Sequence, residues 1–118
     1  VAFGRKLSDQ GSVREDIAKS SCEIEQARLL TLKAADAMDR VGNKAAKEII
    51  SQIKIIAPNM AATVIDRAMQ IHGAMGVGQD TFLPQGFAYA RMIRLADGPD
   101  QVHMSQLGKL LVKRNITK

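Results

Sequence analysis

The chain has 118 residues, of which 46% are hydrophobic and 25% charged, a balance typical of a single soluble globular domain. One cysteine, Cys22, excludes an internal disulfide framework and any cysteine-based zinc cluster, and aromatic residues make up only 3% of the chain. The net charge is +5, but the basic residues are scattered and few aromatic side chains are available for base stacking, which argues against a nucleic-acid-binding module.

The amino-terminal part of the chain predicts a long amphipathic helix of about 30 residues. Apolar residues recur at steps of three, four or seven between Gly11-Ser12 and Gly42-Asn43, a spacing that places them on one helix face. Ser12 followed by Glu15 is a capping-box pattern, in which the two side chains bond each other's free backbone amides. Gly42 provides the stop, because glycine readily takes the left-handed conformation of a helix end.

A second apolar stripe predicts another long helix between Asn43 and Ile71. Its Ile, Met, Val and Ala residues are spaced by three or four positions. Pro58 falls inside this run, where the missing amide is expected to bend or split the helix. The glycines of residues 73–78 end the run. Because two such long helices bury little on their own, part of each stripe is expected to meet another domain or subunit.

The remaining residues predict two shorter helices. Residues 79–86 are expected to be irregular, residues 87–95 can form two helical turns, and residues 97–100 are a turn followed by a helix start. The leucines of residues 102–114, with Lys and Arg near the carboxyl end, predict the last helix. The sequence therefore predicts an all-α fold, an antiparallel four-helix bundle that forms a single domain over residues 1–118.

Two sequence patterns could indicate a ligand-binding site, but each is weak evidence by itself. His72 and His103 are too few and too far apart to indicate a metal site, so no metal ligand is predicted. Residues 73–78 loosely resemble a phosphate-binding loop, since glycine lets backbone amides approach an anion. They lack a preceding strand and a Walker-type lysine, so a helix stop and turn explains them better.

Asp97 is the strongest candidate for a functional carboxylate in the sequence. It follows Leu95-Ala96 and precedes Gly98-Pro99, in a stretch with few solubilising neighbours. An apolar environment disfavours the charged form of a carboxylate and so makes it a stronger base. Aspartate often caps a helix, and from the pattern alone a cap on the last helix is the favoured interpretation of Asp97.

Three blocks in this order resemble the C-terminal helical domain of the acyl-CoA dehydrogenases. They are Val1 to Gln10, Gln70 to Gly76, and Arg94 to His103. The Leu-Ala-Asp-Gly-Pro-Asp variant of the third block is most similar to the long-chain branch whose members carry an aminoglycoside-phosphotransferase-like domain upstream. The resemblance implies that the chain is a fragment of a larger flavoenzyme, in which FAD lies between the domains and across a subunit boundary.

The resemblance also implies which residues contact the cofactor. These are Phe3 and Gln10 in the first block, Gln70, Ile71, His72, Gly73 and Ala74 in the second, and Pro99, Asp100 and Gln101 in the third. Three positions depart from the family's pattern. Gln10 lies one place earlier than the family's glutamine, Ala74 replaces a glycine, and Pro99 lacks the threonine hydroxyl and amide found there in the family.

Asp97 occupies the place of the family's catalytic glutamate, with Gly98 beside the substrate. The resemblance implies that the Asp97 carboxylate removes the α-proton of an acyl-CoA thioester while a hydride passes from the β-carbon to the flavin. The Asp97 amide would help to hold the thioester carbonyl. Aspartate is one methylene shorter than glutamate, and some family members carry the base on an earlier helix.

The function implied is an acyl-CoA dehydrogenase that introduces an α,β double bond into fatty acyl-CoA thioesters in β-oxidation, with this domain inactive by itself. The implied partners are fatty acyl-CoA, a homo-oligomer (dimer or tetramer) and an electron-transferring flavoprotein, with no nucleic acid and no membrane span. The implied location is the mitochondrial matrix, with the peroxisome as the alternative. A non-catalytic oligomerisation bundle that keeps the fold without the chemistry is the alternative function.

Overall fold

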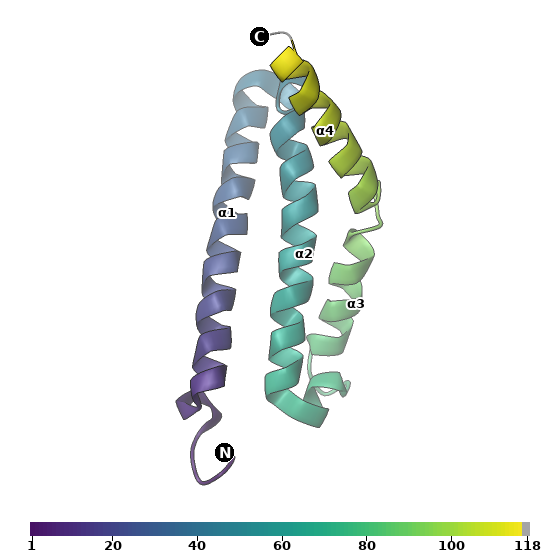
Figure 1. Cartoon of the computed structure of the whole chain (residues 1–118). Helices are drawn as coiled ribbons and strands as arrows, with labels where there is room; N and C mark the ends of the chain where they lie inside the picture. Colours follow the sequence, from purple (N-terminus) through teal and green to yellow (C-terminus); the bar gives the residue numbers. More distant parts are fainter. Residues whose placement is uncertain (117–118) are drawn as a thin grey trace.

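The computed structural model describes residues 1–116 and is built almost entirely of helices (Figure 1). In chain order these are η1 (Leu7–Asp9), α1 (Gly11–Ala45), α2 (Lys47–His72), η2 (Gly73–Val77), α3 (Leu83–Ile93) and α4 (Asp100–Ile116). α2 runs antiparallel to α1, and α3 and α4 follow one another along the other side of α2. The predicted all-helical antiparallel bundle is therefore confirmed. Within the described part of the chain, no helix is long and apolar enough to cross a membrane.

The two long helices begin and end close to the predicted positions. Gly42 leaves the helical conformation with φ 78° and ψ 172°, and the amide of Ala46 bonds its carbonyl before α2 begins. The predicted capping box was wrong. Gln10 is the N-cap of α1, so Ser12 already lies inside the first helical turn. The Gln10 side chain makes no capping hydrogen bond to the helix.

Proline acts differently at its two helical positions from what the sequence suggested. α2 runs without interruption from Lys47 to His72, so the helix is not split at Pro58. The Pro58 side chain is buried. α3 begins at Leu83, earlier than predicted, because Pro84 lies in the first helical turn, where a missing amide breaks no helical bond. Gly86 then packs on the ring of Phe82, where a Cβ atom would lie only 2.5 Å from the ring.

α2 is the central helix, with α1 on one side and α3 and α4 on the other. The molecule measures 62 × 26 × 25 Å. Its radius of gyration is 18.0 Å, against about 13 Å for a compact chain of this length. Apart from Pro58 and two glycines, the buried apolar residues of the described chain are all alanines: Ala27, Ala34, Ala46 and Ala90. Much of the apolar surface of the stripes therefore remains exposed.

A bidentate ion pair ties α1 to α2. Arg67 donates two hydrogen bonds to the carboxylate of Glu23, at 2.6 and 2.9 Å, and a third to the hydroxyl of Ser20 at 3.3 Å. These hydrogen bonds hold the pKa of Glu23 below the ordinary glutamate value of 4.5. The pair therefore favours the folded chain above that pH and ceases to do so as the carboxylate is protonated.

Two glycine substitutions should change stability in opposite directions. A Cβ atom at Gly76 would clash with the backbone carbonyl of Met69, so Gly76→Ala should push η2 off α2 and lower the free energy of unfolding by about 1–3 kcal/mol. Gly108 lies inside α4 with open space around it, so Gly108→Ala should raise the same quantity by about 0.5–1 kcal/mol. Chemical denaturation followed by far-ultraviolet circular dichroism measures both. Equal effects would contradict the packing of η2.

Glu23→Gln should reduce the dependence of stability on pH. The folded-state pKa of Glu23 lies below its ordinary value of 4.5, so the stabilisation from this pair is present above that pH and is lost as the pH falls through the folded-state pKa. The variant should be less stable at neutral pH and should lose less on acidification, as measured by thermal unfolding along a pH series. Asp36→Asn, which opens the exposed pair with Arg40, is the matched control and should change little across that series.

Candidate functional site

Left-handed backbone marks two of the predicted site residues. Among the non-glycine residues that the structure describes, only Phe3 and Asp97 have positive φ, 54° in each case. Each is followed by a glycine with positive φ, Gly4 at 75° and Gly98 at 102°. Such backbone costs a non-glycine residue about 1–2 kcal/mol, and residues that keep it are concentrated at functional sites.

Asp97 lies in the turn between α3 and α4, at the edge of an apolar groove of about 430 Å³. The groove is lined by Thr31, Ile50, Ile53, Lys54, Ala57, Pro58, Ile93, Asp97 and His103. The Asp97 side chain is exposed, so this chain by itself does not supply the apolar burial expected from the sequence. The structure also does not favour the interpretation in which Asp97 caps α4. Asp97 lies three residues before α4, and its carboxylate accepts no hydrogen bond within residues 1–116.

A second property of this turn is the pairing of the backbone amides of Asp97 and Gly98. Neither donates a hydrogen bond to any residue in the described part of the chain, whereas the amides of Leu95, Ala96 and Asp100 all do. Two unpaired amides beside a carboxylate can hold a carbonyl oxygen while the carboxylate acts on the neighbouring carbon.

Polar contacts from α2, from α4 and from Arg94, which follows α3, hold this turn in place. Lys54 of α2 donates to the carbonyl of Ile93 at 2.6 Å, and Asn59 of α2 donates to the carboxylate of Asp100 at 3.1 Å. Arg94 Nε donates to the same carboxylate oxygen at 2.9 Å. His103 Nε2 of α4 lies 3.2 Å from the carbonyl oxygen of Asp97, and it donates there in the tautomer that carries its hydrogen on that nitrogen.

Asp100 is a buried carboxylate, with only 5% of the residue exposed. Burial alone would raise its pKa, but the hydrogen bonds from Asn59 and Arg94 outweigh it and hold the pKa below the ordinary aspartate value. Because the side chain is engaged inside the chain, the cofactor contact predicted for Asp100 would fall to its backbone. Pro99 and Gln101 were also predicted to contact the cofactor, and here Pro99 is half-buried and Gln101 is exposed.

Phe3 and Gln10 come together at the amino-terminal end. Ala2 and Arg5 exchange two backbone hydrogen bonds, of 2.9 and 3.2 Å, around the Phe3-Gly4 turn. The side-chain amide of Gln10 donates to the carbonyl of Ala2 at 3.2 Å and accepts from Arg5 at 3.4 Å. Gln10 thus braces a turn at whose tip Phe3 is 98% exposed. An apolar ring held outward in this way is available to a ligand or partner.

The second predicted block, Gln70 to Ala74, lies at the carboxyl end of α2. Gln70, His72, Gly73 and Ala74 are exposed, and Ile71 is half-buried. Gly73 takes φ 63°, and the Nδ1 atom of His72 lies 2.8 Å from the carbonyl oxygen of Ala68. At a rise of about 1.5 Å per residue, Gln70 lies roughly 24 Å along α2 from Lys54, which lines the Asp97 groove. One chain therefore does not bring this block to the Asp97 turn.

The structure also shows residues that the sequence did not single out. Lys54 and Asn59 lie between members of the apolar stripe of α2, where polar residues are ordinary, so no signal in the sequence marked them. Arg94 and His103 stood at the two ends of the third sequence block without an assigned role. Their function in the turn depends on contacts between helices, which spacing along the chain does not reveal.

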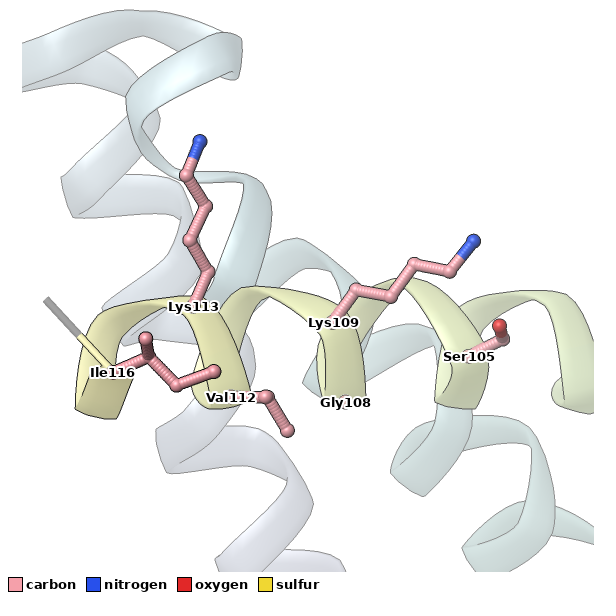
Figure 2. A pocket seen from close by; sticks show the side chains of 6 residues that line it. All are labelled: Ser105, Gly108, Lys109, Val112, Lys113 and Ile116. Carbon is pink, nitrogen blue, oxygen red and sulfur yellow. The ribbon is translucent and has the colours of Figure 1, made fainter.

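A further hollow of about 520 Å³ lies along α4, lined by Ser105, Gly108, Lys109, Val112, Lys113 and Ile116 (Figure 2). It is a depression on the surface of one helix, with the lysines extending to one side and Val112 and Ile116 to the other. None of its lining residues lines the Asp97 groove. Across residues 1–116, no three His, Cys, Asp or Glu side chains lie close enough together to hold a metal ion.

Comparisons with known proteins agree with the predicted fold and family. Residues 1–112 match the model of the acyl-CoA dehydrogenase C-terminal domain. Acyl-CoA dehydrogenase family member 10 of Mus musculus is 53% identical over 113 residues, which are 96% of this chain and 11% of the mouse protein. The chain thus spans a small part of this relative.

Solved structures share the arrangement of helices. A protein from Mycobacterium abscessus assigned to the acyl-CoA dehydrogenases superimposes with a TM-score of 0.94 at 44% identity, over 98% of this chain and 28% of that one. The FAD complex of PigA has a TM-score of 0.87 at 21% identity, over 97% of this chain and 29% of that one, a likeness of fold alone. The chain therefore belongs to the acyl-CoA dehydrogenase family, whose C-terminal domain it matches over nearly its whole length.

Proposed function

We propose that this chain is the FAD- and acyl-CoA-contacting C-terminal domain of an acyl-CoA dehydrogenase. The observation that carries the proposal is the Asp97 turn. A carboxylate with left-handed backbone stands at the edge of an apolar groove, beside two amides that have no partner within residues 1–116. Membership of the acyl-CoA dehydrogenase family supports the same function.

The residues present fit a flavin nucleotide. Phe3 offers an exposed aromatic ring on a braced turn, and Gln70 to Ala74 offer an exposed helix end with a flexible glycine backbone. Because these two segments make no extensive contact with the Asp97 turn in one chain, the second would serve the cofactor of a neighbouring subunit. A bound flavin supplies the hydride acceptor for the reaction.

This chain's own residues supply the acid–base part of the chemistry. The Asp97 carboxylate takes the α-proton of the thioester, and the amides of Asp97 and Gly98 hold the thioester carbonyl, where negative charge develops. Loss of that proton and of the β-hydride leaves the α,β double bond. Because Asp97 is exposed in this chain, bound substrate and the rest of the protein would exclude water from it.

The wider assignments belong to the same proposal. Fatty acyl-CoA is the substrate, the enzyme is a homo-oligomer, and an electron-transferring flavoprotein reoxidises it. The exposed apolar surface of the helices supports contacts with other domains and subunits. The net charge of +5 suits an anionic substrate and a basic compartment such as the mitochondrial matrix, with the peroxisome as the alternative. Fusion to a phosphotransferase-like domain stays a prediction.

Asp97→Asn in the complete protein should stop the chemistry without removing the cofactor. The amide keeps the shape of the carboxylate but accepts no proton, so anaerobic addition of a long-chain acyl-CoA should bleach the flavin about 10²- to 10⁴-fold more slowly than in the unmutated protein. Stopped-flow absorbance measures this rate. Asp66→Asn, at an exposed position on α2, is the control and should bleach normally.

Either of two other results would redirect the assignment. If Asp97→Asn bleaches as fast as the unmutated protein, the base lies outside this chain. If the unmutated protein neither holds FAD nor bleaches, the non-catalytic oligomerisation bundle is the better description.

Gly98→Ala should distort the Asp97 turn. Gly98 has φ 102°, and a Cβ atom there would lie 3.0 Å from His103 Nε2. The variant should slow flavin bleaching by about tenfold, since a small displacement of a reacting group has a large effect on rate. Gly108→Ala is the matched control in open space. The double variant Gly98→Ala/His103→Ala relieves the steric contact, keeps the backbone strain and also removes the His103 contact with the Asp97 carbonyl. Full recovery would therefore show that neither the strain nor that contact matters for the rate.

A further inference from the structure

The buried carboxylate of Asp100 joins two parts of the structure through one oxygen atom. Its Oδ2 accepts hydrogen bonds from Asn59 of α2 at 3.1 Å and from Arg94 at the end of α3 at 2.9 Å. Its Oδ1 is buried and has no partner within the described residues. Asp100 is therefore placed by contacts inside the chain, and it does not line the Asp97 groove.

The same residue also closes the turn through its backbone. The amide of Asp100 donates to the carbonyl of Arg94 at 3.1 Å, so amide and carboxylate together tie the two ends of a loop that has Asp97 near its middle. Lys54 holds the carbonyl of Ile93, immediately before the loop, to α2. Both ends of the loop are thus fixed to α2, at positions 54 and 59.

α2 also supplies one wall of the groove at whose edge Asp97 lies, through Ile50, Ile53 and Ala57. The contacts of Asp100 therefore fix the Asp97 carboxylate relative to that wall. They also hold the left-handed backbone of Asp97 and Gly98, which would otherwise relax toward ordinary conformations.

We propose that Asp100, with Arg94 and Asn59, is a positioning unit that sets the place of the Asp97 carboxylate against the groove. This inference rests on the proposed function, in which Asp97 is the base. Asp100 touches neither substrate nor reacting atoms in this role and acts through the loop. Its importance follows from the sensitivity of proton transfer to position, since a displacement of about 1 Å can lower a rate by roughly a hundredfold.

Asp100→Asn in the complete flavoprotein tests the unit with little change of shape. Its amide oxygen can still accept at the Oδ2 position, but the charge is lost. The amide hydrogens must then occupy the Oδ1 position, which is buried and makes no hydrogen bond to the described residues in the unmutated chain. We expect hydrogen exchange in residues 94–100 to accelerate by about tenfold, measured by mass spectrometry without substrate. We also expect flavin bleaching per bound flavin to slow by about 10- to 100-fold, with the dissociation constant for acyl-CoA changed by less than about threefold.

Two further variants make the test decisive. Asn59→Ala removes one hydrogen bond and leaves the ion pair between Arg94 and Asp100. It should therefore accelerate hydrogen exchange and slow flavin bleaching by smaller factors than Asp100→Asn. It also replaces Asp100→Asn if that variant fails to fold. Asp36→Asn, in the exposed pair with Arg40, should change neither.

The outcomes separate this inference from the function on which it rests. If the unmutated protein bleaches but Asp100→Asn bleaches at the same rate per bound flavin, the inference is overturned and the proposed function stands. Loss of stability or flavin content with an unchanged rate per flavin also overturns the inference, since it shows a purely structural role. If the unmutated protein holds flavin and does not bleach, the proposed function fails and the inference fails with it.

Discussion

The position of every other element depends on the apolar packing of α2, the one helix of the described chain that is contacted on both sides. α1 packs along one side and α3 with α4 along the other (Figure 1). Hydrophobic burial drives this contact but does not fix how far one helix slides along another. Polar ties set that register: Arg67 with Glu23 toward α1, and Lys54 and Asn59 toward the α3–α4 turn.

Polar ties also hold the two turns where the backbone is least relaxed. Asp97 and Phe3 both have left-handed backbone, and each turn is held by side chains that reach it from elsewhere. Gln10 braces the Phe3 turn, and Asp100 with its two donors closes the loop that contains Asp97. Strain of this kind persists only where surrounding contacts fix it, which links the packing of the helices to the proposed chemistry.

Because α2 is the one helix contacted on both sides, most side chains of the described chain are only partly covered. The described chain has no large apolar side chain that is fully buried, and exposed residues such as Phe82 and Tyr89 lie beside α2 along an open groove of about 640 Å³. In the proposed flavoenzyme, contacts with other domains and subunits would cover this surface. The open edge of the Asp97 groove belongs to the same exposed surface.

The sequence alone determined the helices and the three blocks of predicted site residues. Periodic apolar residues and the glycines at positions 42 and 73 specify where helices run and stop, because these effects act within a few residues. Only the tertiary structure decided that Asp97 is exposed, that Asp100 is buried, and that Gln70 to Ala74 lie far from the Asp97 turn. Asn59 and Asp100 are 41 positions apart in the chain, and their contact exists only because packing on α2 sets the helices in one register.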